Sequence, residues 1–206
     1  MQVSDTLLSM QWILAGLGNP GNEYDGTRHN VGRDFLRAFG KHEGVKEWKD
    51  DKKLHAQSAK AELFGKKSLL VLPDTYMNSS GRAFLSLVAS KKQAEQLIVV
   101  QDELDLPLGI VKVAFGSSAG GHRGVDSIQK ALKTKDFVRI RVGISASTAS
   151  GKVKKPDSEK VVDFVLGKFK ASEEDKLKKA RKVVFEAIEL ILTEGRDAAM
   201  MKVHTK

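Results

Sequence analysis

One stretch organises this chain: Gly16-Leu17-Gly18-Asn19-Pro20-Gly21-Asn22-Glu23-Tyr24-Asp25-Gly26-Thr27-Arg28-His29-Asn30. The apolar run Trp12-Ile13-Leu14-Ala15 precedes it, and an amphipathic run from Val31 to Phe39 follows it. This order predicts a strand, a glycine-rich loop with polar side chains, and then a helix. Glycines, asparagines and a histidine crowded into one loop suit a functional site better than a core.

The glycines of this loop allow a dinucleotide-binding interpretation. Gly16, Gly18 and Gly21 match G-x-G-x-x-G after a strand. That fingerprint requires the helix to open within the motif, and an acid to end a second strand about 20 residues later. Here Pro20-Gly21-Asn22 predicts a turn in place of the helix start. The region where the second strand should lie, Gly40-Lys41-His42-Glu43-Gly44, is polar and interrupted by glycines. We therefore expect the glycines to let the backbone turn sharply beside a ligand.

Composition indicates a globular chain with a basic surface. The 206 residues are 41% hydrophobic, and the net charge of +9 gives a pI of about 9.6. Such a charge favours polyanionic partners, meaning nucleic acid or an anionic membrane. The absence of cysteine excludes thiol catalysis, disulfides and thiolate metal sites. Apolar runs such as Leu97-Ile98-Val99-Val100 are too short to span a bilayer, and we expect no targeting leader because no basic residue precedes Arg28.

Hydrophobic patterns along the rest of the chain predict a mixed sheet. The expected strands cover residues 59–64, 68–72, 96–101, 110–115 and 137–144. The expected helices follow Gly81 and cover residues 125–132, 161–166 and 172–193. Loops are expected at 43–53 and 147–157, an N-terminal extension at 1–10 and a tail at 196–206. Because a hairpin interrupts the alternation of strands and helices, we expect one domain over residues 1–206, an α/β fold with a twisted, mixed β-sheet covered by helices.

Polar clusters follow several predicted strands. They are Asn19 to Asn30, Tyr76 to Asn78, Asp102 to Asp105, and His122-Arg123. In sheets of this kind, sites gather at the loops that leave the carboxyl ends of strands. We therefore expect these clusters to form one site.

Two kinds of chemistry fit parts of these clusters poorly. Gly116-Ser117-Ser118-Ala119-Gly120 matches the G-x-S-x-G motif of serine hydrolases, but the histidine of such a triad follows the serine, and the only histidine far downstream is His204. A metal site could draw on His29, His122 and the aspartates, yet no metal-ligand spacing appears among them.

A histidine acting as a general base on water fits the clusters better. The pKa of an unperturbed imidazole is about 6.5, which suits proton removal near neutrality. A nearby aspartate would fix the histidine tautomer and make the ring more basic, and asparagine amides could hold a developing oxyanion. This combination suits hydrolysis of an activated ester, with His29 as a candidate base.

Several ordered motifs carry a family resemblance. The first joins Gly16-Leu17-Gly18-Asn19-Pro20-Gly21 and Tyr24 to Thr27-Arg28-His29-Asn30-Val31-Gly32. The later ones, in order, are Tyr76-Met77-Asn78-x-Ser80-Gly81, Asp102-Glu103-Leu104-Asp105-Leu106-Pro107-x-Gly109, Gly120-Gly121-His122-x-Gly124, Arg139-x-Arg141-x-Gly143-Ile144 and Val161-x-x-Phe164-Val165-Leu166-Gly167. Together they resemble the signature of bacterial-type peptidyl-tRNA hydrolases over nearly the whole chain.

The resemblance implies an enzyme that cleaves the ester between a peptide and the 3′ ribose of tRNA. It implies no metal or other cofactor, release of free tRNA and peptide, and recycling of tRNA from stalled or aborted translation. By resemblance, His29 would be the general base that activates water, and Asp102 would hydrogen-bond its imidazole. Asn19 would help to distinguish an N-blocked peptidyl substrate from a free aminoacyl one.

The resemblance also implies residues that bind the substrate. Tyr24 and Tyr76 would line the site, Asn78 would bind near the scissile ester, and His122 would border the tRNA 3′ end. Candidates for contacts with backbone phosphates are basic residues. They are Lys112, Arg141, Lys152, Lys154 and Lys155.

Two positions depart from the family pattern. Arg123 stands where the family usually has asparagine, and Ala114 stands where many relatives carry a second lysine. An arginine offers donors but no acceptor, so we expect Arg123 to contact substrate and to rebuild a phosphate clamp that Ala114 weakens. These departures leave one alternative, a non-catalytic RNA-binding relative that acts in RNA processing. We expect a cytoplasmic monomer, with an organellar location left open.

Overall fold

The computed structural model describes residues 11–148 and 150–203, so the expected N-terminal extension lies outside the described residues. The strands are β1 (Trp12–Gly16), β2 (Lys49–Asp51), β3 (Ala56–Leu63), β4 (Lys66–Pro73), β5 (Leu97–Pro107), β6 (Val111–Phe115), β7 (Val138–Ser147) and β8 (Val153–Lys154). The α-helices are α1 (Val31–His42), α2 (Lys91–Ala94), α3 (Arg123–Leu132), α4 (Val161–Leu166), α5 (Glu174–Thr193) and α6 (Arg196–Val203). The 3-10 helices are η1 (Asn22–Tyr24), η2 (Arg28–Asn30), η3 (Met77–Phe84), η4 (Ser158–Lys160) and η5 (Ala171–Glu173).

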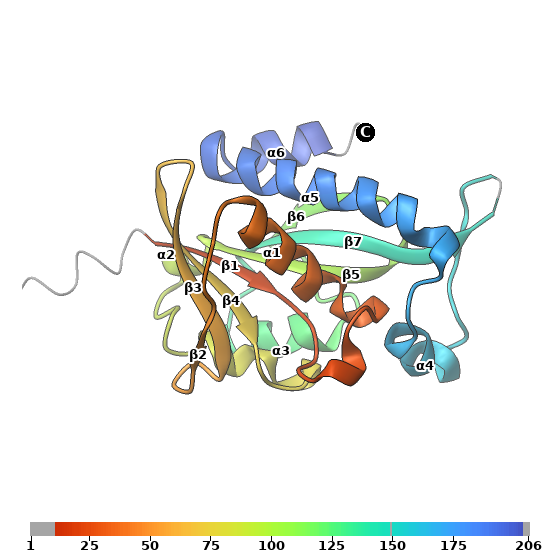
Figure 1. Ribbon diagram of the computed structural model, residues 1–206, viewed down its shortest axis with the longest axis horizontal. Helices are drawn as coiled ribbons and strands as arrows, with labels where there is room; N and C mark the ends of the chain where they lie inside the picture. Colours follow the sequence, from red (N-terminus) through yellow and green to blue (C-terminus); the bar gives the residue numbers. More distant parts are fainter. Residues whose placement is uncertain (1–10, 149, 204–206) are drawn as a thin grey trace, which may run out of the picture.

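The strands form one mixed sheet in the order β2-β3-β4-β1-β5-β7-β6, with β8 paired to β7 (Figure 1). Its centre is parallel, because β1 pairs with β4 and β5, and β5 pairs with β7. The β3–β4 hairpin and the β6–β7 pair are antiparallel. The sheet confirms the predicted single-domain α/β class.

Helices cover both faces of the sheet, because successive side chains of a strand point to opposite sides. Leu14 and Val100 belong to a core shared with α1, α5 and α6, which lie together above the sheet in Figure 1. Ile13 and Val99 belong to a second core on the other face, shared with η3 and α3. The site forms at the end of the sheet, where the central parallel strands leave these two cores.

The glycines of the first loop serve both turning and close packing. Gly21 and Gly26 have positive φ angles of 104° and 71°, as expected for turns, whereas Gly18 packs closely against its neighbours. A Cβ on Gly18 would lie 2.7 Å from Cβ of Arg33 and 3.0 Å from Cγ of Asn30. A Cβ on Gly32, in the first turn of α1, would lie 2.2 Å from the carbonyl oxygen of Val100. The absence of side chains here lets the N-terminus of α1 sit against β1 and β5, which brings His29 to the end of the sheet. The helix begins well after the G-x-G-x-x-G match, so the dinucleotide interpretation is excluded.

Five sequence-based expectations about elements need correction. The predicted loop 43–53 contains the short edge strand β2, and the predicted loop 147–157 contains β8. The helix expected after Gly81 is instead the 3-10 helix η3, which ends at Phe84. Strand β5 does not stop before Asp102 but continues through the acidic residues to Pro107. The tail expected from residue 196 forms α6, because Ala199 and Val203 are buried in the core.

Helix α5 is the longest of the described helices and packs along one face of the sheet. Its apolar stripe includes the buried residues Val184, Ile188 and Ile191, while its opposite side is rich in lysine. Within the described part of the chain, no helix has both the length and the apolar character needed to cross a bilayer.

Candidate active site

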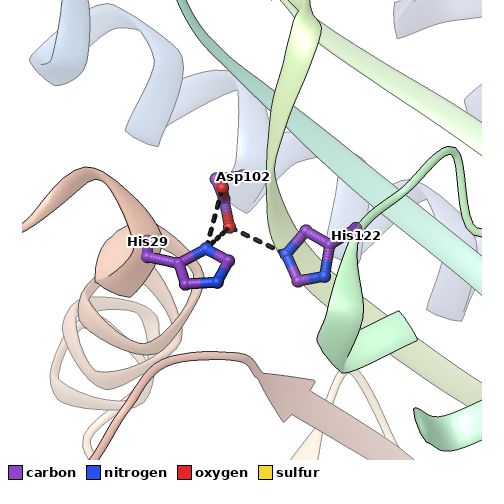
Figure 2. Close-up of side chains that lie close together, drawn as sticks. All are labelled: His29, Asp102 and His122. Carbon is purple, nitrogen blue, oxygen red and sulfur yellow. Dashed lines mark hydrogen bonds and ion pairs between the residues drawn. The ribbon is translucent and has the colours of Figure 1, made fainter. Parts of the chain in front are cut away.

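Two histidines converge on Asp102 from different elements (Figure 2). Asp102 lies on β5, two residues beyond Val100, where the neighbouring strand β1 stops. His29 Nδ1 lies 2.9 Å from Oδ1 and 3.0 Å from Oδ2 of this carboxylate, and His122 Nε2 lies 2.8 Å from Oδ1. The side chain of Asp102 is 3% exposed, so both contacts are shielded from water.

The N-terminus of α3 fixes the tautomer of His122. Nδ1 of His122 accepts hydrogen bonds from the backbone N–H groups of Gly124 at 3.1 Å and Val125 at 3.3 Å. A ring nitrogen that accepts cannot also carry a proton, so the proton of neutral His122 is on Nε2 and is donated to Asp102. The second histidine therefore orients the carboxylate from the side opposite His29.

The free lone pair of neutral His29 lies on Nε2. Its Nδ1 must carry the proton that it donates to Asp102, which leaves Nε2 of the neutral ring unprotonated. Figure 2 shows Nε2 on the side of the ring away from Asp102. This nitrogen is therefore available to accept a proton from water.

Charges in the cluster set the protonation states of its members. Burial has the largest effect on the pKa of His29 and lowers it, but the charge and hydrogen bond of Asp102 together leave the pKa above its ordinary value. Arg123 opposes this rise through charge repulsion. Burial is also the largest effect on Asp102 and raises its pKa, but the two histidines leave this pKa well below its usual range. Asp102 is thus ionised at neutral pH, and His29 becomes a neutral base above its raised pKa.

The three side chains also have the composition of a metal-binding set. One candidate ligand atom from each of His29, Asp102 and His122 lies within 4.8 Å of the others. In the observed arrangement, however, His29 Nδ1 and His122 Nε2 each donate a proton to the carboxylate. A metal ion would need lone pairs at those atoms. The geometry therefore favours a hydrogen-bonded base over a metal centre.

Asn19 is held in place by Asn30, the residue after His29. Its backbone N–H donates to Oδ1 of Asn30 at 2.9 Å, and its carbonyl accepts from Nδ2 of Asn30 at 2.9 Å. Its own Oδ1 accepts the backbone N–H of Met77 at 2.8 Å. No acceptor among the described residues lies within hydrogen-bond distance of Asn19 Nδ2. That amide group is consequently free to donate to a substrate.

The predicted substrate-lining residues lie around Asn19, because Met77 ties η3 to it. The rings of Tyr24 and Tyr76 meet edge to face with centroids 6.5 Å apart. Tyr76 is 63% exposed, and Asn78 is also exposed. The side chains of Tyr76 and Asn78 are therefore open to a bound molecule, and Tyr24 is half-buried. His122, predicted to border the tRNA 3′ end, is 7% exposed and engaged with Asp102.

The basic residues predicted to contact phosphates are not equally free. Lys112 on β6 is exposed and lies opposite Arg141 on β7. Arg141 Nε is paired with Glu103 Oε2 at 2.7 Å, and Lys155 is paired with Asp105. The remaining predicted contacts, Lys152 and Lys154, are exposed.

The two departures from the family pattern lie on different elements, Arg123 on α3 and Ala114 on β6. Arg123 is the exposed first residue of α3, close enough to His29 to influence its pKa. Ala114 lies opposite Arg139, which is buried and contacts Oγ of Ser117. Arg139 thus braces the loop that leads to His122.

The G-x-S-x-G segment lacks the geometry of a nucleophile elbow. Strand β6 ends at Phe115 and α3 begins only at Arg123, so Ser118 lies in a loop and not at a sharp strand-to-helix turn. Ser117 instead accepts a hydrogen bond from Gln129 through its carbonyl, at 2.8 Å. His204, the partner that the motif would need, lies outside the described residues.

Sequence reasoning missed three structural features of the site. Asn30 belongs to a family motif, but no spacing in the sequence predicts its hydrogen bonds to the backbone of Asn19. The helix cap that fixes His122 could have been sought, because His122 directly precedes a predicted helix. The pairing of Arg141 with Glu103 joins residues on different strands and has no local signature.

Comparisons with known proteins agree on one family. The family profile described as Peptidyl-tRNA hydrolase matches residues 13–206. A relative named peptidyl-tRNA hydrolase from Dehalococcoides mccartyi is 40% identical over 192 residues, covering 91% of this chain and 96% of the relative. One of the same name from Aquifex aeolicus is 42% identical over 183 residues, covering 86% and 90%. A crystal structure of peptidyl-tRNA hydrolase from Acinetobacter baumannii superposes with a TM-score of 0.83 at 30% identity, covering 95% of this chain and 94% of that one. The chain therefore belongs to the peptidyl-tRNA hydrolase family.

Proposed function

We propose that this chain hydrolyses peptidyl-tRNA by general-base catalysis, with His29 as the base. Family membership supports the reaction, which is cleavage of the ester between the peptide and the 3′ ribose of tRNA. Nε2 of His29 takes a proton from water as the water oxygen attacks the ester carbonyl. The same proton then passes to the departing 3′ oxygen, so that peptide acid and free tRNA leave a neutral His29.

One observation carries this mechanism: Asp102 receives two N–H groups, one from each histidine. His122 cannot change its tautomer without losing its hydrogen bonds to the α3 N-terminus. The ionised carboxylate can only accept, so it holds His29 with the protonated Nδ1 toward Asp102 and Nε2 free. The ionised carboxylate also stabilises the imidazolium that forms during proton transfer.

Asn19 is proposed to select N-blocked substrates. A peptidyl-tRNA has an amide carbonyl next to the aminoacyl residue, whereas an unblocked aminoacyl-tRNA has an ammonium group. The free Nδ2 group of Asn19 can donate to a carbonyl but not to an ammonium, which carries only donors. Tyr24, whose ring meets that of Tyr76, and Asn78 on η3 would contact the rest of the acceptor end.

The proposed RNA contacts involve charge and not base recognition. Lys112, Lys152 and Lys154 are exposed cations that can neutralise phosphates, and Arg141 and Lys155 could exchange their carboxylate partners for phosphates. Arg123 is proposed to supply the cation that Ala114 does not. Replacing Arg123 by asparagine should reduce the salt dependence of tRNA affinity by a slope of about 0.7–0.9. The matched control is Lys130→Asn, on the same helix, and equal slopes for the two variants would refute the compensation.

Substrate selection tests the proposed function. N-acetyl-aminoacyl-tRNA and unblocked aminoacyl-tRNA are offered to the wild type, to Asn19→Asp and to Asn22→Asp, an exposed asparagine in the same loop. Aspartate keeps the acceptor for the Met77 N–H but removes the free amide donor. The wild type and Asn22→Asp should strongly prefer the blocked substrate, and Asn19→Asp should lose that preference. Binding of tRNA without hydrolysis of either substrate would instead favour the non-catalytic RNA-binding alternative.

A further inference from the structure

Arg28, which directly precedes His29, is a buried cation between two aromatic rings. Its guanidinium carbon lies 4.8 Å from the ring centroid of Phe164 and 4.7 Å from that of Phe169. Its Nη2 donates to Glu173 Oε2 at 2.8 Å, and the Arg28 side chain is 7% exposed. A planar guanidinium stacked in this way has few alternative positions. We name Phe164, Phe169 and Glu173 the Arg28 clamp.

Main-chain contacts join the same two segments. The backbone N–H of Arg28 donates to the carbonyl of Gly167 at 3.0 Å, and Thr27 forms an antiparallel bridge with Lys168. The loop before His29 is thus attached to the segment from α4 to η5 by both backbone and side chain. Figure 1 shows α4 beside the loop that leads from β1 to α1. The last family motif, which contains Phe164 and Gly167, otherwise has no part in the proposed chemistry.

Glu173 is itself oriented by its own segment. Its Oε2 accepts the backbone N–H of Lys170 at 2.7 Å in addition to the hydrogen bond from Arg28. Burial, the largest effect, raises the pKa of Glu173, but these hydrogen bonds and the nearby cations leave the pKa below its usual value. The ionised carboxylate is therefore held by two hydrogen bonds, one from Arg28 and one from the backbone of its own segment.

His29 lies between two anchors within the three-residue helix η2. On one side, Asn30 is bonded to the backbone of Asn19. On the other side, Arg28 is held by the clamp, whose residues follow more than 130 positions later in the chain. A shift of either neighbour would move the imidazole relative to Asp102, because a helix of three residues is too short to adjust its backbone around the displaced neighbour.

We propose that Arg28 is a positioning residue for His29, and that the Arg28 clamp holds His29 Nδ1 in contact with Asp102. The inference rests on the proposed role of His29 as the base. It assigns the α4–η5 segment a part in the reaction that acts through Arg28, the neighbour of His29 in η2. It also predicts that loosening the clamp affects the chemical step more than the binding of tRNA.

The test compares Arg28→Lys with Arg37→Lys. Lysine keeps the charge but lacks the planar group that stacks between the rings. Arg37 also lies over an aromatic ring, 5.9 Å from the centroid of Trp48, but it is on the exposed side of α1 and serves as the matched control. Hydrolysis of N-acetyl-aminoacyl-tRNA is measured as kcat and KM between pH 5 and 9. Arg28→Lys should lower kcat by about 10- to 100-fold with KM unchanged, as expected for a misplaced catalytic group.

The pH profile separates positioning from a general loss of fold. The charged or titratable groups that face His29 are Asp102 from β5, His122 from the loop before α3, and Arg123 from α3. Weaker contact with Asp102 lets the pKa of His29 fall, so the acidic limb of the kcat profile should move to lower pH in Arg28→Lys. A merely structural defect would lower the plateau without moving that limb. An unmoved limb, or kinetics equal to those of Arg37→Lys, would overturn the positioning role.

A second variant keeps the test decisive if Arg28→Lys melts below the assay temperature. Phe169→Leu removes one ring of the clamp and should move the limb in the same direction. The loss in the double variant should be smaller than the product of the two single losses, because both act through one contact. A loss of kcat in the double variant equal to the product of the two single losses would count against the clamp. So would an acidic limb that does not move in Phe169→Leu. His29→Ala is assayed alongside: full activity there would refute the proposed base, whereas its inactivity with a normal Arg28→Lys would refute only the positioning role.

Discussion

Replacement of Asp102 by asparagine is expected to invert the tautomer of His29. An asparagine offers one oxygen and one NH2 group where the carboxylate offers two oxygens. His122 must keep its proton on Nε2, so the oxygen is required at the Oδ1 position, 2.8 Å from that nitrogen. The NH2 group then takes the Oδ2 position, 3.0 Å from His29 Nδ1, where two donors would face each other, and the one remaining oxygen, 2.9 Å from the same Nδ1, already accepts from His122. His29 relieves this conflict by moving its proton to Nε2, the atom that should take a proton from water.

The expected loss of activity is large because the base is then blocked. A wrong tautomer of a catalytic histidine costs about 10⁴-fold in kcat in a well-studied triad, which sets the upper end of the range. We expect a 10³- to 10⁴-fold loss, or about 4–5.5 kcal/mol of transition-state stabilisation, with the fold retained. Steady-state hydrolysis of N-acetyl-aminoacyl-tRNA measures kcat, and ¹⁵N NMR of labelled histidine reports the tautomer. Asp126→Asn, at an exposed position on α3, is the control. A loss of less than about 10-fold, or an Nδ1–H tautomer of His29 in Asp102→Asn, would refute this reasoning.

Three further predictions concern stability. Asn30→Ala leaves the N–H and carbonyl of Asn19 without their partners, and chemical unfolding should show a loss of about 2–3 kcal/mol; a loss near zero would mean that this brace is dispensable. Burial, with a smaller contribution from a neighbouring carboxylate, raises the pKa of Asp34 to about 6. The folded state therefore loses stability as the pH rises through 6 and Asp34 ionises. Asp34→Asn should remove this loss and increase the free energy of unfolding by up to about 3 kcal/mol at pH 8, and by much less at pH 4.5. Melting temperatures at the two pH values measure the difference. An equal gain at both pH values would contradict the shift. Gly32→Ala would place a Cβ 2.2 Å from the Val100 carbonyl oxygen, and thermal melts should show a loss of about 1–3 kcal/mol; a stability equal to wild type would show that α1 can move away freely.

The order of strands and helices could be predicted because it depends on local patterns. Strand β5 shows where such patterns fail. Its acidic residues predict the end of a strand, but each finds a distant partner: Asp102 the two histidines, Glu103 Arg141, and Asp105 Lys155. Those contacts let the strand continue. Likewise, the residues from 196 onward look polar, yet Ala199 and Val203 pack into the core once α5 turns back at Gly195.

The candidate site could be predicted as a set of residues but not as a hydrogen-bond network. The family motifs name His29, Asp102 and Asn19, and the structure brings them to one end of the sheet. The tautomer of His122 depends on where α3 begins, which is two residues earlier than its apolar pattern indicates. The Arg28 clamp joins residues 145 positions apart in the chain, as the Arg28–Glu173 pair shows. Long-range contacts of this kind have no local signal.

His29 is proposed to activate water without a metal ion. The most direct measurement is hydrolysis of N-acetyl-aminoacyl-tRNA by the wild type, His29→Ala and His42→Ala, each with and without chelator. His42 has an exposed side chain on α1 and controls for the loss of an imidazole. We expect a loss of about 10²- to 10⁴-fold for His29→Ala, wild-type rates for His42→Ala, and no effect of the chelator. A His29→Ala protein that retains wild-type activity, or a wild type that the chelator inactivates, would contradict metal-free catalysis by His29.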